Sequence, residues 1–234
     1  MEPVKIDLKK EQQASRARPR YPYSAVARVF FGSMDMLTGK QTTLAKAKLV
    51  EILATVPYRA WERREHARVT RHQGDGARAQ EAGAIMRWGQ EAQDNEHWHL
   101  LVIEEKLRED AAKKAWYLSP PLPSLMVGPY GLLTWTMARL AIRRAFVLNA
   151  EFEDHAEHTY AQLVQDHPEW EDQPVESAVV QQYGSFGSWA DVFRRVGLDE
   201  RDHMNNSFVF GGRPEHVVKY EGMPEAAGAD PQAA

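Results

Sequence analysis

Four acidic elements recur along this chain at matched spacing, and every second one carries a histidine three residues later. Their order is Glu, Glu-x-x-His, Glu, Glu-x-x-His, formed by Glu51, Glu96, His99, Glu153, Glu200 and His203. The step between the two elements of each half is 45 residues in the first half and 47 in the second. Because three residues turn an α-helix by about 300°, the glutamate and histidine of each pair share one face. We call these six residues the ligand set.

The sequence around each element has the apolar spacing of a helix. Four stretches show it, residues 43–71, 76–110, 141–165 and 187–209, and each contains one element of the ligand set. Pro57 predicts a kink in the first stretch. Ser188 is the predicted start of the last stretch, whose middle is weakened by Gly197. No stretch alternates strictly enough to predict a strand, so the predicted fold class is all-α.

Composition limits the chemistry. A chain of 234 residues is long enough for one domain with tails. The absence of cysteine excludes disulfides, thiolate catalysis, iron–sulfur clusters and zinc fingers. The formal net charge of −4 gives no overall attraction to nucleic acid, so no nucleic-acid partner is expected. No apolar run follows the start, so no secretory signal is predicted.

Two terminal segments differ in composition from the middle of the chain. "KIDLKKEQQASRARPR" is basic and polar, so residues 1–21 are predicted to form a flexible basic arm. "GMPEAAGADPQAA" lacks bulky apolar residues, so residues 211–234 are predicted to form a disordered tail. Residues 22–210 are then predicted to form the helical bundle.

The ligand set fits a centre of two metal ions. Ferritin-like di-iron bundles take one Glu from each of two helices and a Glu-x-x-His from each of the other two. Four carboxylates balance the charge of two Fe(II) ions, and imidazole suits iron. One Glu-x-x-His alone equally describes a solvated helix face. Four carboxylates buried without a counter-charge would cost several kcal/mol each. We therefore expect a ferritin-like four-helix bundle with two iron ions.

Four short motifs resemble those of a known family. "LVEILATVPY", "NEHWHLLVIEE", "EDHAEHTY" and "LDERDH" are similar to the ligand motifs of the alternative oxidase family, and closer to its plastid terminal oxidase branch. The resemblance covers residues 42–206. It implies a di-iron quinol oxidase that oxidises ubiquinol or plastoquinol, reduces O2 to water and is insensitive to cyanide. It also implies that the ligand set holds the iron.

The resemblance assigns Tyr160 a role in the chemistry. Tyr160 lies seven residues after Glu153, so it returns to the same helix face within about 20°. In the family this tyrosine is redox-active and lies near the iron pair. The alternative is a core tyrosine whose hydroxyl is hydrogen-bonded.

Five further residues are expected to surround the metal centre. By resemblance, His155 and Thr159 lie near the quinol pocket, and Lys46 stands where the family tends to carry an arginine beside it. The alternative for Lys46 is a solvated side chain. Asn95 and Asp199 each precede a ligand glutamate and are expected to orient the histidines. The regulatory cysteine of plant members cannot exist here, and the resemblance does not fix which quinone is used.

Two apolar stretches are expected to lie in a membrane surface. Residues 122–148 are the most apolar, but two prolines and three arginines make them a poor membrane span. They suit an interfacial helix, as do residues 23–39 beside the basic arm. Ordinary core packing is the alternative. We expect a monotopic peripheral protein on the cytoplasmic face of a bacterial inner membrane, and the family implies a homodimer.

Two other functions share this ligand set. A di-iron quinone-biosynthesis hydroxylase would insert oxygen into a ring, and a ferritin-like metal-binding bundle would store metal without quinol chemistry. Interfacial helices and Tyr160 favour the quinol oxidase, because a storage protein requires neither.

Overall fold

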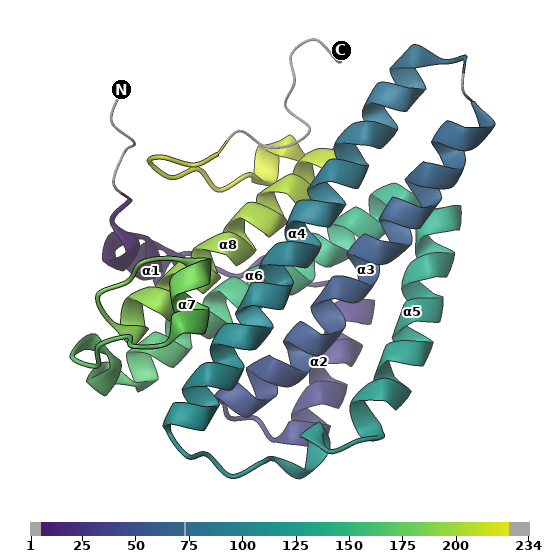
Figure 1. Cartoon of the computed structure of the whole chain (residues 1–234). Coiled ribbons are helices and arrows are strands. Elements are labelled where there is room, and N and C mark those ends of the chain that lie inside the picture. The colour runs from purple at the N-terminus through teal and green to yellow at the C-terminus, as the bar shows by residue number, and fades with distance from the viewer. Residues whose placement is uncertain (1–5, 73, 225–234) are drawn as a thin grey trace.

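The computed structural model describes residues 6–72 and 74–224, and its regular structure there is entirely helical (Figure 1). The helices are α1 Leu8–Ala17, α2 Ala25–Thr38, α3 Leu44–Arg71, α4 Gly76–Glu109, α5 Leu122–Leu140, α6 Ile142–Asp166, α7 Ala178–Tyr183 and α8 Trp189–Phe210. Three short 3-10 turns are η1 Trp116–Leu118, η2 Pro168–Glu171 and η3 Pro214–His216. The predicted all-α class is confirmed.

The four helices that carry the ligand set begin and end close to the predicted positions. Thr43, Asp75 and Ser188 cap α3, α4 and α8, and each side chain accepts a hydrogen bond from the backbone N–H three residues later. The predicted cap at Ser188 is therefore confirmed. Pro57 lies inside α3, which continues through it as one helix to Arg71.

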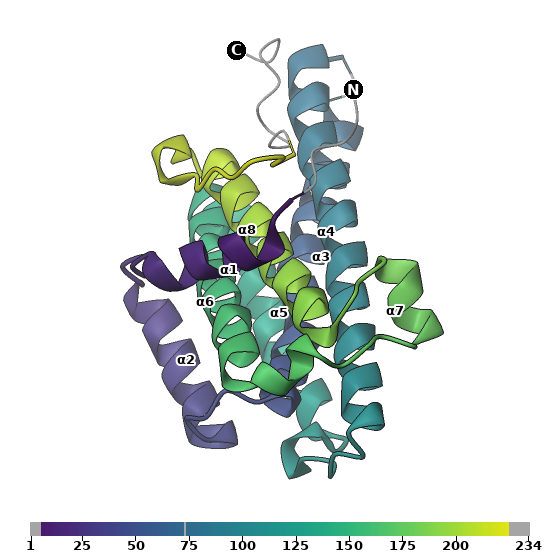
Figure 2. The same cartoon turned by 90° about the vertical axis from the view of Figure 1, so that its left-hand side faces the viewer.

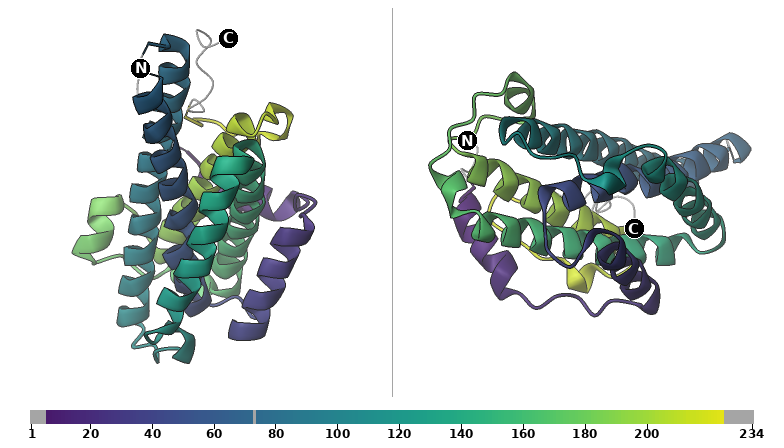
Figure 3. Two further views of the ribbon diagram at one scale, coloured as in Figure 1. Left: turned by 90° about the vertical axis from the view of Figure 1, so that its right-hand side faces the viewer. Right: turned by 90° about the horizontal axis from the view of Figure 1, so that it is seen from below.

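These four helices form the centre of the molecule. α3 lies along α4 and α6 lies along α8, while α4 also touches α8 and α3 touches α6. α5 packs on the outside of α3 and α2 packs against α6 (Figure 3). α1 crosses the outer side of α6 and α8 (Figure 2). The ligand helices are thus covered by α1, α2 and α5.

Gly197 makes the close packing of α6 and α8 possible. A Cβ placed on it would lie 3.2 Å from the Cβ of Tyr160. The glycine was expected to weaken this helix, yet α8 runs unbroken from Trp189 to Phe210. The entropic cost of a helical glycine is offset here by a close approach that a larger residue would prevent.

The predicted flexible arm over residues 1–21 is wrong for its described part. Residues 8–17 form α1, which is attached by a buried ionic network. The guanidinium of Arg201 on α8 donates to Glu157 at 2.8 Å and to Glu11 of α1 at 2.6 Å. Arg18 donates to Asp154 at 2.6 Å and to Glu157 at 2.7 Å. Arg18 of the arm is therefore paired with buried carboxylates of α6, and Glu11 of α1 with an arginine of α8. Residues 1–5 lie outside the described residues.

Arg201→Ala should destabilise the protein strongly. The substitution leaves Glu157, whose side chain is fully buried, without one of its two cationic partners. Breaking a buried ion pair from one side costs about 3–5 kcal/mol. Chemical denaturation followed by circular dichroism measures the loss. Arg108→Ala is the matched control, because its pair with Glu105 is on the surface and should contribute nothing measurable. Equal stability of the two variants would contradict the role of the network.

The predicted disordered tail over residues 211–234 is also wrong for its described part. The backbone N–H and C=O of Val218 are both hydrogen-bonded to the side chain of Asn205 on α8, at 2.8 and 2.9 Å. The hydroxyl of Tyr220 donates to Asp202 at 2.8 Å. Side chains of α8 thus hold the segment in place despite its few apolar residues. Residues 225–234 lie outside the described residues.

The apolar stretch 122–148 is not one helix. α5 ends at Leu140 and α6 begins at Ile142. Ala141 between them has a non-helical backbone, with φ at −156°. Among the described residues, no helix combines the length and the apolar character needed to cross a membrane.

Candidate metal centre

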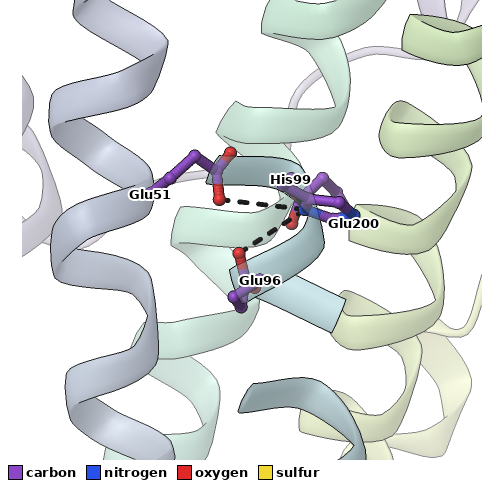
Figure 4. Close-up of side chains that lie close together, drawn as sticks. All are labelled: Glu51, Glu96, His99 and Glu200. Atoms are coloured by element: carbon purple, nitrogen blue, oxygen red, sulfur yellow. Dashed lines mark ion pairs between the residues drawn. The ribbon is translucent and has the colours of Figure 1, made fainter. Parts of the chain in front are cut away.

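The six residues of the ligand set meet in the centre of the bundle. Glu51 comes from α3, the first Glu-x-x-His pair from α4, Glu153 from α6 and the second pair from α8. All six are buried. Figure 4 shows four of them pointing toward one shared space from three different helices. The matched spacing in the sequence therefore corresponds to one site in the fold.

The ligand set divides into two overlapping groups of four. Glu51 and His99 belong to the first group, and Glu153 and His203 to the second, while Glu96 and Glu200 belong to both. The candidate ligand atoms within each group lie within 4.8 Å of one another. Two shared carboxylates with one further carboxylate and one imidazole at each end is the arrangement of a two-metal site. Each group could hold one metal ion.

The distances between the imidazoles and the shared carboxylates support this division. His99 Nδ1 lies 3.0 Å from Glu200 Oε1 and 3.6 Å from Glu96 Oε2. His203 Nδ1 lies 3.0 Å from Glu96 Oε1 and 3.5 Å from Glu200 Oε2. Each histidine thus faces both shared carboxylates, and each shared carboxylate turns one oxygen toward each group.

The atoms that face the centre lack ordinary partners. Eleven buried side-chain nitrogen and oxygen atoms in the described residues have no hydrogen-bond partner, and seven of them belong to the ligand set. These are Glu51 Oε2, both oxygens of Glu96, both oxygens of Glu200, and Nδ1 of His99 and His203. Unpaired buried polar atoms are rare and costly. A cation between them would satisfy all seven, so the residues present fit a metal.

The tautomer of His99 is set by a carboxylate behind it. Asp199 Oδ2 lies 3.3 Å from His99 Nε2, and because a carboxylate only accepts, Nε2 carries the proton. In the neutral ring, which is the form that binds a metal, Nδ1 then has its lone pair facing the shared carboxylates. Asp199 also accepts from Asn95 at 3.3 Å, from Arg195 at 2.8 Å and from the Tyr183 hydroxyl. Asp199 thus contacts His99 directly, whereas Asn95 contacts Asp199; that the two residues orient the histidines stays a prediction.

Without a metal, the charges at this centre would be compensated by protons. Burial, followed by the charge of Glu96, raises the pKa of Glu51 well above its usual range. Burial and the charge of Glu200 do the same to the pKa of Glu153. Burial alone would lower the pKa of His99, but the charge of Glu200 and the contact with Asp199 raise it. Metal binding must therefore displace protons, as is usual for sites with carboxylate and imidazole ligands.

The two unshared glutamates are each held by a tyrosine from the opposite helix. The hydroxyl of Tyr160 on α6 donates to Glu51 Oε1 on α3, and the hydroxyl of Tyr58 on α3 donates to Glu153 Oε1 on α6 at 2.8 Å. Asn149 adds a second hydrogen bond to Glu153 Oε1 at 2.7 Å. Tyr58 and Asn149 were not predicted. The step of seven residues that singles out Tyr160 after Glu153 also leads from Glu51 to Tyr58.

A cavity of about 220 Å³ opens onto the ligand set. The predicted pocket residues Lys46, His155 and Thr159 all line it, and so does Tyr160. Its walls also include all four glutamates of the ligand set, side chains of α2 such as Phe30, Phe31 and Met34, and Tyr130 of α5. The cavity therefore joins the metal centre to the surface covered by α2 and α5.

The polar groups of the cavity are themselves fixed. Lys46 is partly buried, and its ammonium pairs with Asp35 and donates to the carbonyl of Gly39 at 3.0 Å. The His155 ring stacks on Phe31 with 4.0 Å between centroids, and its Nδ1 lies 3.2 Å from the guanidinium of Arg20. Burial and then the charge of Arg20 lower the pKa of His155 to about 4. His155 is therefore neutral near pH 7.

No protein-family model matches this chain, and no curated protein matches it either. The assignment of the centre therefore rests on the positions and chemistry of its own side chains.

Proposed function

We propose that this protein is a membrane-surface di-iron quinol oxidase of the alternative oxidase type, closer to the plastid terminal oxidase branch. The observation that carries the proposal is the double ligand group opening into a cavity that leads to α2 and α5. Two quinols would be oxidised to two quinones while one O2 is reduced to two waters. Iron, when bound, supplies the binding of O2 and the transfer of electrons to it.

The donor set supports iron as the metal. Four carboxylates and two imidazoles leave two Fe(II) ions electrically balanced, and mixed oxygen and nitrogen donors suit iron better than magnesium or calcium. The shared glutamates Glu96 and Glu200 would contribute to holding both ions. Glu51 with His99 would complete one position, and Glu153 with the second histidine the other.

The cavity residues would position a quinol head group. An arginine only donates, so His155 Nδ1 accepts from Arg20 and the neutral ring carries its proton on Nε2. That N–H is a donor for a quinol or quinone oxygen. Tyr160 lines the cavity and its hydroxyl donates to Glu51, so it lies between the substrate space and the metal ligands. We assign it the transfer of one electron and one proton.

Quinol oxidation coupled to O2 uptake is the decisive measurement. Iron-loaded protein in lipid vesicles should consume O2 only when quinol is added, and cyanide should not block it, since the ligand set contains no haem or copper site. Elemental analysis should find two irons per chain. Uptake that ignores quinol, or an active preparation containing zinc and no iron, would refute the proposal.

Exposed apolar side chains on α2 and α5 support attachment to a membrane surface. On α2 they are Val26, Val29 and Met36, on α5 Leu125, Leu132, Leu133, Trp135 and Leu140, and in η1 Trp116. The two helices adjoin, since Phe30 and Tyr130 lie 5.7 Å apart between ring centroids. Apolar side chains exposed on adjoining helices mark an interaction site. Because other residues of the same two helices line the cavity, these side chains suit delivery of a membrane-dissolved quinol.

Charges placed on this face should release the protein from vesicles. Leu132→Glu with Trp135→Glu should abolish co-sedimentation with vesicles of mixed zwitterionic and anionic phospholipid. Ala77→Glu with Gln80→Glu, on the exposed part of α4, is the matched control and should bind like the unaltered protein. Binding should partly survive high salt but not detergent. If both double variants bind equally, the membrane proposal fails.

The homodimer and the cytoplasmic face of a bacterial inner membrane remain part of the proposal. Dimerisation would double the number of interfacial helices and so strengthen attachment. Analytical ultracentrifugation in detergent measures the oligomeric state.

A di-iron quinone-biosynthesis hydroxylase is the second candidate, because the same cavity could admit a ring as substrate. Product analysis with labelled O2 separates the two: the oxidase releases the label as water, whereas the hydroxylase places it in the ring. A storage bundle is disfavoured by the cavity, whose aromatic and basic lining a metal store does not require.

A further inference from the structure

A run of oxidisable rings leads from the metal centre into the bundle. The ring centroid of Tyr58 lies 5.9 Å from that of His203, 5.0 Å from Trp61 and 5.6 Å from Trp88. The two indoles are stacked at 5.2 Å with 22° between their planes. The Tyr58 hydroxyl donates to Glu153, so the run begins at a ligand. None of these three rings lines the cavity that holds Lys46, His155 and Thr159.

The equivalent tyrosine of the other half has different neighbours. The ring of Tyr160 stacks near Phe193, with 6.3 Å between centroids and 10° between planes. Trp170 and Trp189 lie beyond Phe193, at 4.8 and 6.0 Å from it. A phenylalanine ring is far harder to oxidise than a phenol or an indole. Tyr160 is therefore insulated from the tryptophans behind it, whereas Tyr58 touches its tryptophans directly.

We propose that Tyr58, Trp61 and Trp88 form an electron-transfer path that carries single oxidising equivalents out of the metal centre when the cavity holds no quinol. The proposal rests on the O2 chemistry proposed above. Without that O2 chemistry the protein would have no source of oxidising equivalents. When quinol is present, Tyr160 at the cavity would deliver the electrons instead.

The electrons and protons of the path balance. Tyr58 would give up one electron, for which bound iron would supply the acceptor, and its phenol proton would pass to Glu153, which accepts the Tyr58 hydrogen bond. An electron from Trp61 or Trp88 restores Tyr58, and the proton returns. A one-electron reductant in solution, such as ascorbate, then restores the indole. Phe210, which is partly exposed, stacks on Trp88 at 4.8 Å, so Trp88 is the ring from which the path leaves the core.

The surroundings of the two indole N–H groups favour tryptophans that pass an oxidising equivalent on over tryptophans that retain it. Nε1 of Trp61 and Nε1 of Trp88 are buried and have no hydrogen-bond partner among the described residues. An oxidised indole without a proton acceptor keeps its proton and remains strongly oxidising. It is therefore quickly reduced again. Each one-electron transfer along this path would remove an oxidising equivalent that could otherwise damage the ligand histidines.

The path can be tested on iron-loaded protein without quinol, with hydrogen peroxide as the oxidant. Freeze-quench electron paramagnetic resonance should detect a tryptophan radical, and peptide mass spectrometry should find oxidised indole at Trp61 and Trp88. Ascorbate should suppress both. Tyr58→Phe should lose most of the radical and of the indole oxidation. Trp170→Phe, a buried tryptophan behind the insulating ring, is the control and should leave both unchanged.

Three outcomes would overturn the proposal. Oxidation spread equally over Trp170 and Trp189, or a signal that Tyr58→Phe does not reduce, contradicts the path while leaving the oxidase function intact. Trp88→Phe is a conservative change that keeps an aromatic ring. A radical signal that persists unchanged in this variant also contradicts the path and leaves the oxidase function intact. Protein that takes up no iron contradicts the path and the proposed function together. Circular dichroism and iron content confirm that each variant is folded and loaded.

Discussion

Glu96→Ala should leave a folded helical protein that holds neither iron firmly, whereas Glu51→Ala should retain one. Glu96 belongs to both ligand groups, so its loss removes a donor from each position. Glu51 belongs to one group, and the group containing Glu153 and His203 stays complete without it. Quinol-dependent O2 uptake should vanish in both variants, because four-electron reduction requires both ions. Iron per chain after reconstitution and gel filtration is the measurement.

The control for this pair lies on the same helix. Glu91 is an exposed glutamate of α4 outside both groups, and Glu91→Ala should keep two irons and full activity. Two firmly bound irons in Glu96→Ala would show that neither ion needs this carboxylate. Equal iron loss in Glu96→Ala and Glu51→Ala would show that the two positions fill only together.

Tyr160→Phe should lose most of its turnover while its iron content is unchanged. The variant keeps the ring beside Phe193 and the packing against Gly197, and removes only the hydroxyl that donates to Glu51. Burial, and then the charge of Glu51, raises the pKa of Tyr160 well above its usual range, so the phenol is protonated and has a proton to give with its electron. Steady-state O2 uptake with quinol measures the loss.

Turnover and iron content, measured together, separate the explanations of such a loss. If Tyr160→Phe turned over within about twofold of the unaltered protein, roughly 0.4 kcal/mol in the barrier, Tyr160 would be only a core residue. If turnover fell together with iron content, the hydroxyl would serve to hold Glu51 in place. Thr159→Ala, one residue earlier at the cavity wall, should raise KM for quinol more than it lowers kcat.

The helices and the ligand set could be predicted because their signals are local. A Glu-x-x-His pair shares a face by helix geometry, and caps such as Thr43 and Ser188 lie within three residues of the group they satisfy. The site then follows from four helices whose polar faces must meet. Tyr58 could have been predicted in the same way, since it follows Glu51 by seven residues as Tyr160 follows Glu153.

The errors concern contacts between residues far apart in the chain. Arg18 is basic and near the start, which predicts a solvated arm, but its partners Asp154 and Glu157 lie 136 and 139 residues away. No local pattern indicates such a pairing. The same holds for Asn205, which orders Val218 in the predicted tail, and for Asp35, whose carboxylate pairs with Lys46 across the α2–α3 connection.

Each group of candidate ligands includes one residue from the other half of the chain, and this has a consequence for assembly. Each group of four candidate ligands takes three residues from its own half of the chain and the fourth from the other half, which is Glu200 for the first group and Glu96 for the second. Neither α3 with α4 nor α6 with α8 can complete a position alone. A nascent chain released before α8 would therefore hold no complete metal site. If the proposed iron binds, its retention would report that both halves of the chain have been made and have docked.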